Sequence, residues 1–249
     1  MRVLLCALTG MGNLVLEALL AWPRCMTLSV LTRSESGLFP HYSCGHLDAL
    51  CADQGIPCRT DLSLTSPEAL DYMRSFKPDV LLCATFHQRV PPEVLALAGR
   101  AALNIHMSLL PAYRGPTPTS WTILRGERET GISFHQLSEG LDEGVLYAQR
   151  RMAVNGRTDG ELRLALSELA AAEVCGVLDG VLGGWLTPTP QDESRAFWLP
   201  KAGSEEALTL LVGERPPLER LERGLMPQPG PDFLARVRRA LADTADEEG

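Results

Sequence analysis

The sequence predicts an α/β fold: a mostly parallel, twisted sheet flanked by helices, followed by a small helical C-terminal appendage. Short apolar runs alternate with helical patterns in the first half of the chain, which is typical of βαβ units. Prolines divide the last part into short helical patterns, at positions 216, 217, 227, 229 and 231. With 45% hydrophobic and 22% charged residues among 249, the chain has enough apolar material for a core.

Four apolar runs in the first half are interpreted as strands, and helical patterns separate them. The expected strands cover residues 2–8, 26–32, 79–85 and 101–106. The expected helices cover residues 14–22, 46–54, 67–76 and 91–98. Because helical crossovers join strands that run in the same direction, these strands are expected to be parallel.

The second half begins with an irregular segment. Residues 107–118 are rich in Pro and Gly and predict a loop. Two further strands are expected at 131–137 and 145–153, joined by a turn at 138–144 that contains two glycines and two acidic residues. A long helix is expected from Thr158, which forms a capping-box pattern with Glu161, to about residue 182, before Gly183 and Gly184.

The main domain is therefore expected to cover residues 1–201, and a short helical extension residues 202–249. The extension contains helical patterns at 218–225 and 233–241 and a polar, acidic end that is expected to fray. Its apolar positions fit either docking on the core or formation of a homodimer.

Charge and targeting signals limit the partners. The net charge of −8 weighs against nucleic acid, because proteins that bind phosphate backbones usually carry basic surfaces. The first apolar run reaches Gly10 and Gly12 too soon for a signal peptide or a membrane span, so a cytoplasmic location without a membrane partner is expected. Seven cysteines without a CxxC pair favour reduced thiols.

Asn104 and His106 are the first candidate catalytic residues. They are two residues apart at the end of an expected strand, so both side chains project from the same face. An amide and an imidazole can both donate hydrogen bonds to an oxyanion, and histidine can also exchange protons. The alternative is that His106 merely ends the strand and Asn104 caps a turn.

Asp142 is the third candidate. A carboxylate beside an imidazole favours its protonated form and fixes its tautomer, provided that the two meet in space. Sequence spacing does not show that they meet, and Asp142 otherwise fits an ordinary turn in residues 139–144.

Several motifs in order resemble the formyltetrahydrofolate-dependent formyltransferase family. They are Asn104–Gly115 (NIHMSLLPAYRG), Glu129–Gly131 (ETG) and Glu139–Gly144 (EGLDEG), together with Lys77–Asp79 (KPD) and Gln191–Ser194 (QDES). The resemblance extends from Arg2 to about Lys201. It implies the Rossmann-like formyltransferase fold, with 1–201 as the catalytic domain.

The resemblance also implies roles for individual residues. Asn104, His106 and Asp142 occupy the catalytic positions of the family, and the cofactor is 10-formyltetrahydrofolate as formyl donor. Two segments are expected to cradle the pterin, and their residues are Phe86, His87, Gln88, Arg89, Val90, Leu137, Ser138, Glu139, Gly140 and Leu141. The expected substrate loop contains Ser108, Tyr113, Arg114 and Gly115.

Two features depart from the family pattern. The turn at residues 8–13 resembles a dinucleotide-binding loop but lacks a complete GxGxxG, so a nicotinamide cofactor is not expected. A local group of metal-ligand residue types has spacings that match no common structural zinc site, so a variable loop without metal is expected. That group is His41, Cys44, His46, Cys51 and Cys58.

The expected acceptor is a small amine, either a nucleotide-linked amino sugar or an amino-acid-derived biosynthetic intermediate. Arg89, Arg114 and Arg125 lie near the expected crevice, where they could bind a diphosphate or simply pair with neighbouring acids. Family members that act on methionyl-tRNA typically add a basic C-terminal barrel, for which the extension is too short. Glycinamide ribonucleotide is disfavoured because its transferases resemble the core alone.

Three alternatives remain open at this stage. A methionyl-tRNA formyltransferase and a formyltetrahydrofolate hydrolase use a similar set of residues. The hydrolases usually carry an additional amino-terminal regulatory domain, whereas this sequence starts at the first strand, so transfer is preferred. A non-catalytic folate-binding protein is the alternative from another class, but it has no need for all three polar residues.

Overall fold

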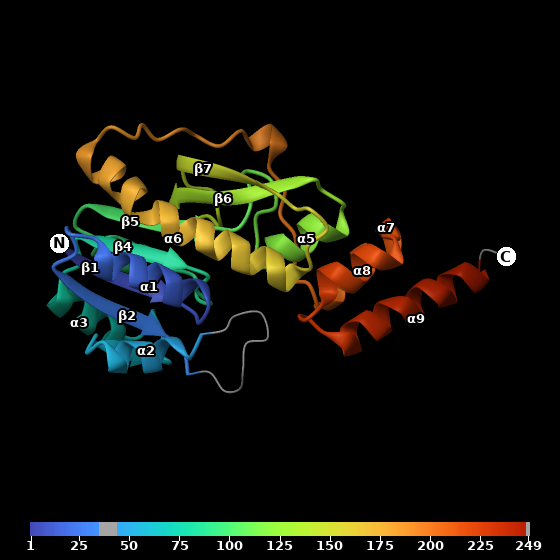
Figure 1. The fold of residues 1–249 in the computed structure, drawn as a ribbon, viewed down its shortest axis with the longest axis horizontal. Coiled ribbons are helices and arrows are strands. Elements are labelled where there is room, and N and C mark those ends of the chain that lie inside the picture. The colour runs from blue at the N-terminus through green and yellow to red at the C-terminus, as the bar shows by residue number, and fades with distance from the viewer. Residues whose placement is uncertain (35–43, 248–249) are drawn as a thin grey trace.

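The computed structural model describes residues 1–34 and 44–247. In these residues a seven-stranded sheet has the order β3-β2-β1-β4-β5-β6-β7 (Figure 1). The strands are β1 (Arg2–Ala7), β2 (Thr27–Thr32), β3 (Cys58–Thr60), β4 (Val80–Ala84), β5 (Ala101–His106), β6 (Glu129–Gln136) and β7 (Leu146–Ala153). Strands β1 to β5 pair in parallel, whereas β6 is antiparallel to β5 and β7 is antiparallel to β6.

Helices cover both faces of this sheet. Buried residues of α1 (Met11–Ala21), α2 (Leu47–Asp53) and α6 (Asp159–Gly183) join one core cluster, while α3 (Pro67–Phe76) and α4 (Pro92–Leu95) join another. Figure 1 shows α6 running beside α1. The remaining helices are α5 (Pro118–Leu124), the 3-10 helix η1 (Glu193–Arg195), α7 (Glu205–Glu214), α8 (Leu218–Leu225) and α9 (Pro231–Glu247).

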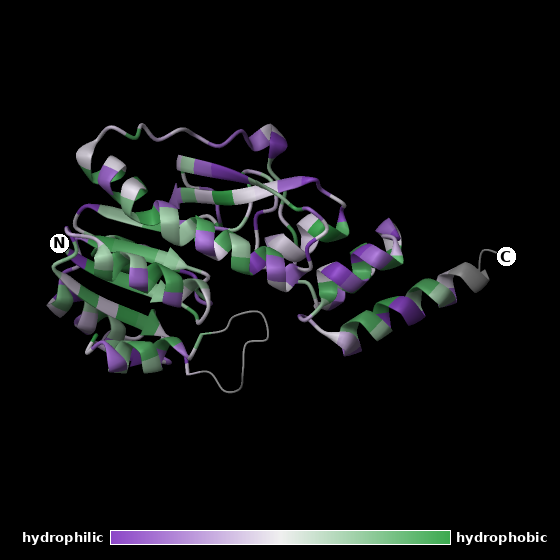
Figure 2. Ribbon diagram, in the orientation of Figure 1, coloured by the Kyte–Doolittle hydropathy of each residue, from purple (hydrophilic) through white to green (hydrophobic). Residues whose placement is uncertain are grey.

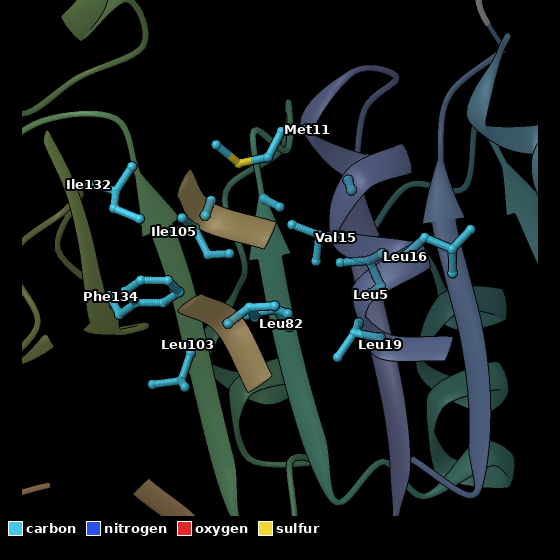
Figure 3. Close-up of a cluster of buried hydrophobic side chains, with 14 of the residues drawn as sticks. Leu5, Met11, Val15, Leu16, Leu19, Leu82, Leu103, Ile105, Ile132 and Phe134 are labelled. Carbon is cyan, nitrogen blue, oxygen red and sulfur yellow. The ribbon is translucent and has the colours of Figure 1, made fainter. Parts of the chain in front are cut away.

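The central strands are apolar on both faces because both faces are covered by helices. In β1, Leu5 belongs to the cluster shared with α1 and α6, whereas its neighbour Leu4 belongs to the cluster on the other face. Figure 3 shows Leu5 together with Leu82, Ile105 and Phe134, each at most 2% exposed. Burying each such side chain stabilises the fold by roughly 1.5–3 kcal/mol, so the end of β5 is rigidly held.

The predicted fold class is confirmed, but β3, α5 and α7 were not predicted. β3 has only three residues at the edge of the sheet. In α5, Pro118 stands in the first turn, but Thr119, Thr122 and Ile123 have low helix propensity, so the pattern does not indicate a helix. The sequence does contain a start signal for α7, because serine is a favoured N-cap residue. In the structure, the Ser204 side chain accepts a hydrogen bond from the backbone N–H of Ala207.

The long helix α6 has the predicted ends. Thr158 accepts from the backbone N–H of Glu161, and the Glu161 carboxylate accepts from the backbone N–H of Thr158, which completes the capping box. Gly184 ends the helix with φ +76°, a conformation that glycine adopts without a steric cost. The last helix, α9, continues to Glu247, six residues past the predicted end at 241, because no Gly or Pro interrupts it.

The C-terminal helices α7 to α9 lie at one end of the molecule (Figure 1), where α8 packs on α5 and α9 packs on α7 and α8. Their apolar side chains form a third cluster with the fully buried Trp121, whose indole N–H donates to the carbonyl of Pro200 over 2.7 Å. Polar and apolar residues alternate along α9 (Figure 2), as in an amphipathic helix. The extension therefore docks on the core, and a homodimer stays a prediction.

Among the helices in the described part of the chain, none has both the length and the apolar character that a bilayer crossing demands.

Candidate active site

The site lies at the edge of the sheet where the parallel strands end. Ala84, the last residue of β4, pairs with Ile105 of β5, so the segment after β4 continues beside His106. Thr85 follows β4 directly and has φ +55°, a left-handed conformation. Ligands of open α/β sheets commonly bind outside this edge.

His106 is 7% exposed and has a fixed orientation. Its Nε2 lies 2.9 Å from the backbone carbonyl of Tyr113. A carbonyl oxygen can only accept, so Nε2 carries a proton and donates it. The other ring nitrogen, Nδ1, faces Oδ2 of Asp142 at 3.6 Å, which leaves Nδ1 as the atom for proton exchange on the carboxylate side.

Asp142 is brought to His106 by the turn between β6 and β7. It is 8% exposed and has φ +57°, and its Oδ2 accepts a hydrogen bond of 3.0 Å from the backbone N–H of Gly115. Burial by itself would raise the pKa of Asp142. The charge of His106 and the Gly115 hydrogen bond outweigh burial, so the pKa lies well below its usual value. Asp142 is therefore ionised near neutral pH.

Asn104 contacts both groups and a residue that was not predicted. Its Nδ2 lies 3.0 Å from Nε2 of His135 and 3.5 Å from Oδ1 of Asp142. His135 Nδ1 donates to the carbonyl of Gln136 over 2.9 Å, so its Nε2 is free to accept from Asn104. One N–H of the Asn104 amide is thereby held by His135, and the second points to Oδ1 of Asp142 over a long 3.5 Å contact that a substrate oxygen could replace.

The structure thus brings Asn104, His106 and Asp142 together and adds His135 to them. His135 lies on β6 directly opposite Asn104 of β5 and is 2% exposed. The available signal was a histidine that follows Ile132 and Phe134 within the strand predicted at 131–137. The antiparallel register that places it opposite Asn104 was not available from the sequence.

Gln191 was also not predicted to act on the site. It is 9% exposed, and its Nε2 donates to the carbonyls of Asp142 over 2.7 Å and Gly144 over 2.8 Å. Its Oε1 accepts from Nε and Nη2 of Arg114. Both ends of the Gln191 amide are therefore used, and they tie the turn of Asp142 to the loop after β5.

Arg114 and Gly115 of the expected substrate loop make hydrogen bonds within the protein. The Arg114 guanidinium is 8% exposed and binds both carboxylate oxygens of Glu193, at 2.7 Å and 3.0 Å. Gly115 has φ +117°, and a Cβ there would lie 2.4 Å from the carbonyl oxygen of Leu199. Only glycine fits at this position, so its N–H can approach Asp142.

The other two residues of that loop are also bonded within the protein. The Ser108 hydroxyl donates to the carbonyl of Ala112 over 2.7 Å, and Ser108 is fully buried. The Tyr113 hydroxyl donates to Glu127 over 2.6 Å, and burial together with this acid raises the Tyr113 pKa. Ser108 and Tyr113 therefore shape the loop, and their contribution to substrate binding stays a prediction.

The two segments expected to hold the pterin lie side by side. The Arg89 guanidinium donates to the carbonyl of Glu139, which joins them directly. Phe86 and Leu137 pack against the same core cluster and supply apolar surface between the segments. Leu141 is 44% exposed beside Asp142, and such apolar surface suits a flat ring system.

Gln88 and Ser138 have local partners. The Gln88 amide bonds to the backbone of Leu62 and Leu64, and the Ser138 hydroxyl donates to the carbonyl of Gly140. A Cβ at Gly140 would lie 1.9 Å from the Glu143 carboxylate, so a side chain at 140 would displace the Glu143 side chain.

Neither departure from the family pattern forms a site in the described residues. The N–H of Gly10 is taken by the Asn13 side chain at 3.0 Å, and Asn13 also bonds to the carbonyl of Gly45. Within residues 1–34 and 44–247, no group of three His, Cys, Asp or Glu side chains could hold a metal ion. His41 of the proposed cluster lies outside the described residues.

Two surface hollows lie elsewhere. One is lined by Arg2, Lys77 and Asp79 at the opposite edge of the sheet, where the parallel strands begin. The other lies between α4 and β7, beside Leu103 and Tyr147. Neither contains Asn104, His106 or Asp142, so the chemistry of the side chains, rather than the depth of a cavity, identifies the site.

The fold and site define a Rossmann-like α/β protein with a cluster of amide, imidazole and carboxylate groups at the carboxyl edge of its sheet. The sequence model of the formyl transferase family matches residues 39–173. The chain belongs to this family, which confirms the resemblance.

Two relatives are named methionyl-tRNA formyltransferase. The protein of Geobacter sulfurreducens is 33% identical over 183 residues, which cover 73% of this chain and 58% of the relative. The protein of Desulfovibrio desulfuricans is 30% identical over 234 residues, which cover 92% of this chain and 69% of the relative. The chain thus spans little more than half of the Geobacter relative.

Among solved structures, the sugar 3N-formyl transferase WlaRD, determined in the presence of dTDP and 5-N-formyl-THF, has a TM-score of 0.65. The sequence identity is 14%, and the match covers 82% of this chain and 71% of WlaRD. This similarity supports the fold.

Proposed function

We propose that this chain transfers a formyl group from 10-formyltetrahydrofolate to the amine of a small molecule. One observation carries the proposal: Asn104, His106 and the ionised Asp142 converge at the carboxyl edge of the sheet. The two segments joined by Arg89 and Glu139 provide backbone groups and apolar surface for the folate beside them.

Each residue has a definite part in the reaction. The neutral amine forms a C–N bond with the formyl carbon, and the carbonyl oxygen becomes an oxyanion that accepts from the Asn104 N–H that otherwise points to Asp142. His106 stabilises the same charge or moves a proton, and Asp142 orients His106 and collects the amine proton. The bond to the folate nitrogen then breaks, that nitrogen takes a proton, and a formamide and tetrahydrofolate leave.

The 3.6 Å between His106 and Asp142 is longer than a hydrogen bond. Catalytic contacts are often long without substrate and shorten in the complex. The Gly115 hydrogen bond fixes Oδ2 of Asp142, so a small approach of the imidazole completes the contact.

The acceptor is proposed to be a small amine, either a nucleotide-linked amino sugar or an amino-acid-derived intermediate. The net charge of −8 supports a small acceptor over nucleic acid. Arg114 and Arg125 pair with the carboxylates of Glu193 and Glu214, so they do not support a diphosphate site, whereas Arg89 donates to the backbone carbonyl of Glu139.

Methionyl-tRNA is the second candidate acceptor, and the names of the relatives favour it. Hydrolysis, with water in place of the amine, is chemically open to the same three residues. A comparison under one set of conditions separates these functions. Methionyl-tRNA, glycinamide ribonucleotide, nucleotide-linked amino sugars and free amino acids should be offered, and formate release should be measured alongside.

Single alanine variants of Asn104, His106 and Asp142 test the site itself. Each should lower turnover on the order of a hundredfold or more while the protein stays folded, as loss of oxyanion donors or acid-base groups does. Asp71→Asn is a suitable control, because Asp71 is an exposed carboxylate whose partner is Arg74. Wild-type turnover in a folded Asp142→Ala variant would remove the basis of the proposal.

A further inference from the structure

Trp198 is a large exposed side chain on a segment that pairs with the loop after β5. The N–H of Arg114 donates to the carbonyl of Phe197 over 3.1 Å, and the N–H of Leu199 donates to the carbonyl of Arg114 over 3.0 Å. These bonds fix the backbone on both sides of Trp198. Leu199 is 4% exposed and anchors the segment in the third core cluster, whereas Trp198 is 54% exposed.

The indole of Trp198 lies next to the residue that holds the catalytic carboxylate. A Cβ at Gly115 would lie 3.2 Å from Nε1 of Trp198. The N–H of the same Gly115 donates to Oδ2 of Asp142 over 3.0 Å. A single residue therefore separates the indole from the group proposed to take the amine proton.

The indole N–H of Trp198 differs in hydrogen bonding from those of Trp22 and Trp121. Trp22 donates to Asp179 and Trp121 donates to the carbonyl of Pro200, and both side chains are buried. In the described part of the chain, the N–H of Trp198 makes no hydrogen bond to protein. A tryptophan that keeps half its surface and its donor exposed beside a reacting group is placed to bind a ligand.

Trp185 provides an internal comparison. It is 65% exposed, but it follows α6 at the opposite edge of the sheet, where Arg100, just before β5, donates to the carbonyl of Leu182. Its rings lie within 2.6 Å of where a Cβ at Gly183 would be, so the indole lies against the end of α6. Exposure alone does not distinguish Trp198, but its position beside Gly115 does.

We infer that Trp198 binds the acceptor and selects an amine carried on a ring. The flat face of the ring stacks on the indole, and an oxygen of the ring or its hydroxyl groups accepts from the indole N–H. The amine then points past Gly115 toward Asp142 and His106. This inference rests on the proposed formyl transfer and specifies its acceptor class as cyclic amino sugars, since a free amino acid with a flexible chain presents no such flat face.

Steady-state kinetics on the whole chain test this assignment. With an amino-sugar acceptor, Trp198→Ala should raise the acceptor KM about tenfold or more, because an aromatic stacking contact and a hydrogen bond are both lost. Trp198→Phe keeps an aromatic face and should give a smaller rise. The KM for 10-formyltetrahydrofolate should stay unchanged, and Trp185→Ala should behave as wild type toward both substrates.

Fluorescence gives a second readout that needs no turnover. The amino sugar should quench tryptophan emission in wild type and in Trp185→Phe, but the quenching should be lost in Trp198→Phe. An unchanged acceptor KM in Trp198→Ala, a raised folate KM instead, or preference for a linear amine would overturn the inference while leaving formyl transfer intact. If wild type formylates no amine at all, the proposed function itself fails.

Discussion

Replacing Gln191 by alanine should damage the site without touching a catalytic side chain. The substitution removes the donors to the carbonyls of Asp142 and Gly144 and the acceptor of Arg114. An unsatisfied buried polar group costs about 1–3 kcal/mol, so a loss of roughly 2–5 kcal/mol in unfolding free energy is expected after water replaces some contacts. Because these carbonyls fix the turn that presents Asp142, turnover should fall roughly tenfold to a hundredfold.

Denaturant unfolding and formyl-transfer kinetics, both at a temperature where the variant is fully folded, measure the two effects separately. Asp192→Ala is the matched control, because Asp192 is the exposed neighbour and its carboxylate accepts from Ser194 of η1. Gln191→Glu keeps an acceptor for Arg114 but turns a carboxylate oxygen toward the two carbonyls, so it should impair turnover as well. A folded Gln191→Ala protein with wild-type kcat would refute the idea that Gln191 positions Asp142.

Three further predictions concern Asp142, Gly115 and His135. The Asp142 pKa is lowered on folding, so Asp142 stabilises the protein above its unfolded pKa of about 4. Wild type should therefore be more stable than Asp142→Asn at neutral pH, and this difference should shrink as the pH falls below the unfolded pKa. Thermal unfolding of both proteins over a range of pH measures it. Gly115→Ala should lower unfolding free energy by on the order of 2–4 kcal/mol, because its Cβ meets the Leu199 carbonyl; a Tm equal to wild type would contradict this. His135→Phe should reduce kcat roughly tenfold by releasing the Asn104 amide, and His135→Gln should restore part of it; equal rates in both variants would oppose an acceptor role.

Most strands and the long helices could be predicted from the sequence, because their signals lie within a few neighbouring residues. Two-sided apolar runs identify buried parallel strands, and the Thr158 capping box identifies the start of α6. By contrast, β3 is too short and α5 too rich in β-branched residues for a local signal.

The candidate site could be predicted only in part, for a related reason. Asn104 and His106 are two positions apart on one strand, so their common face follows from strand geometry. Asp142, His135 and Gln191 reach them through the β6–β7 turn, an antiparallel register and the segment after α6. Such contacts depend on how distant segments pack, which side-chain periodicity does not encode.

A single-turnover experiment with a labelled formyl group on 10-formyltetrahydrofolate tests the central claim most directly. The whole chain, in excess over the donor, would be mixed with each candidate amine, and the label would be followed into formamide, formate and unreacted folate. Formyl transfer through Asn104, His106 and Asp142 predicts one labelled formamide for each tetrahydrofolate released, and neither product on that timescale with Asp142→Asn. Label that appears only in formate, or that stays on the bound folate with every amine, would contradict the account.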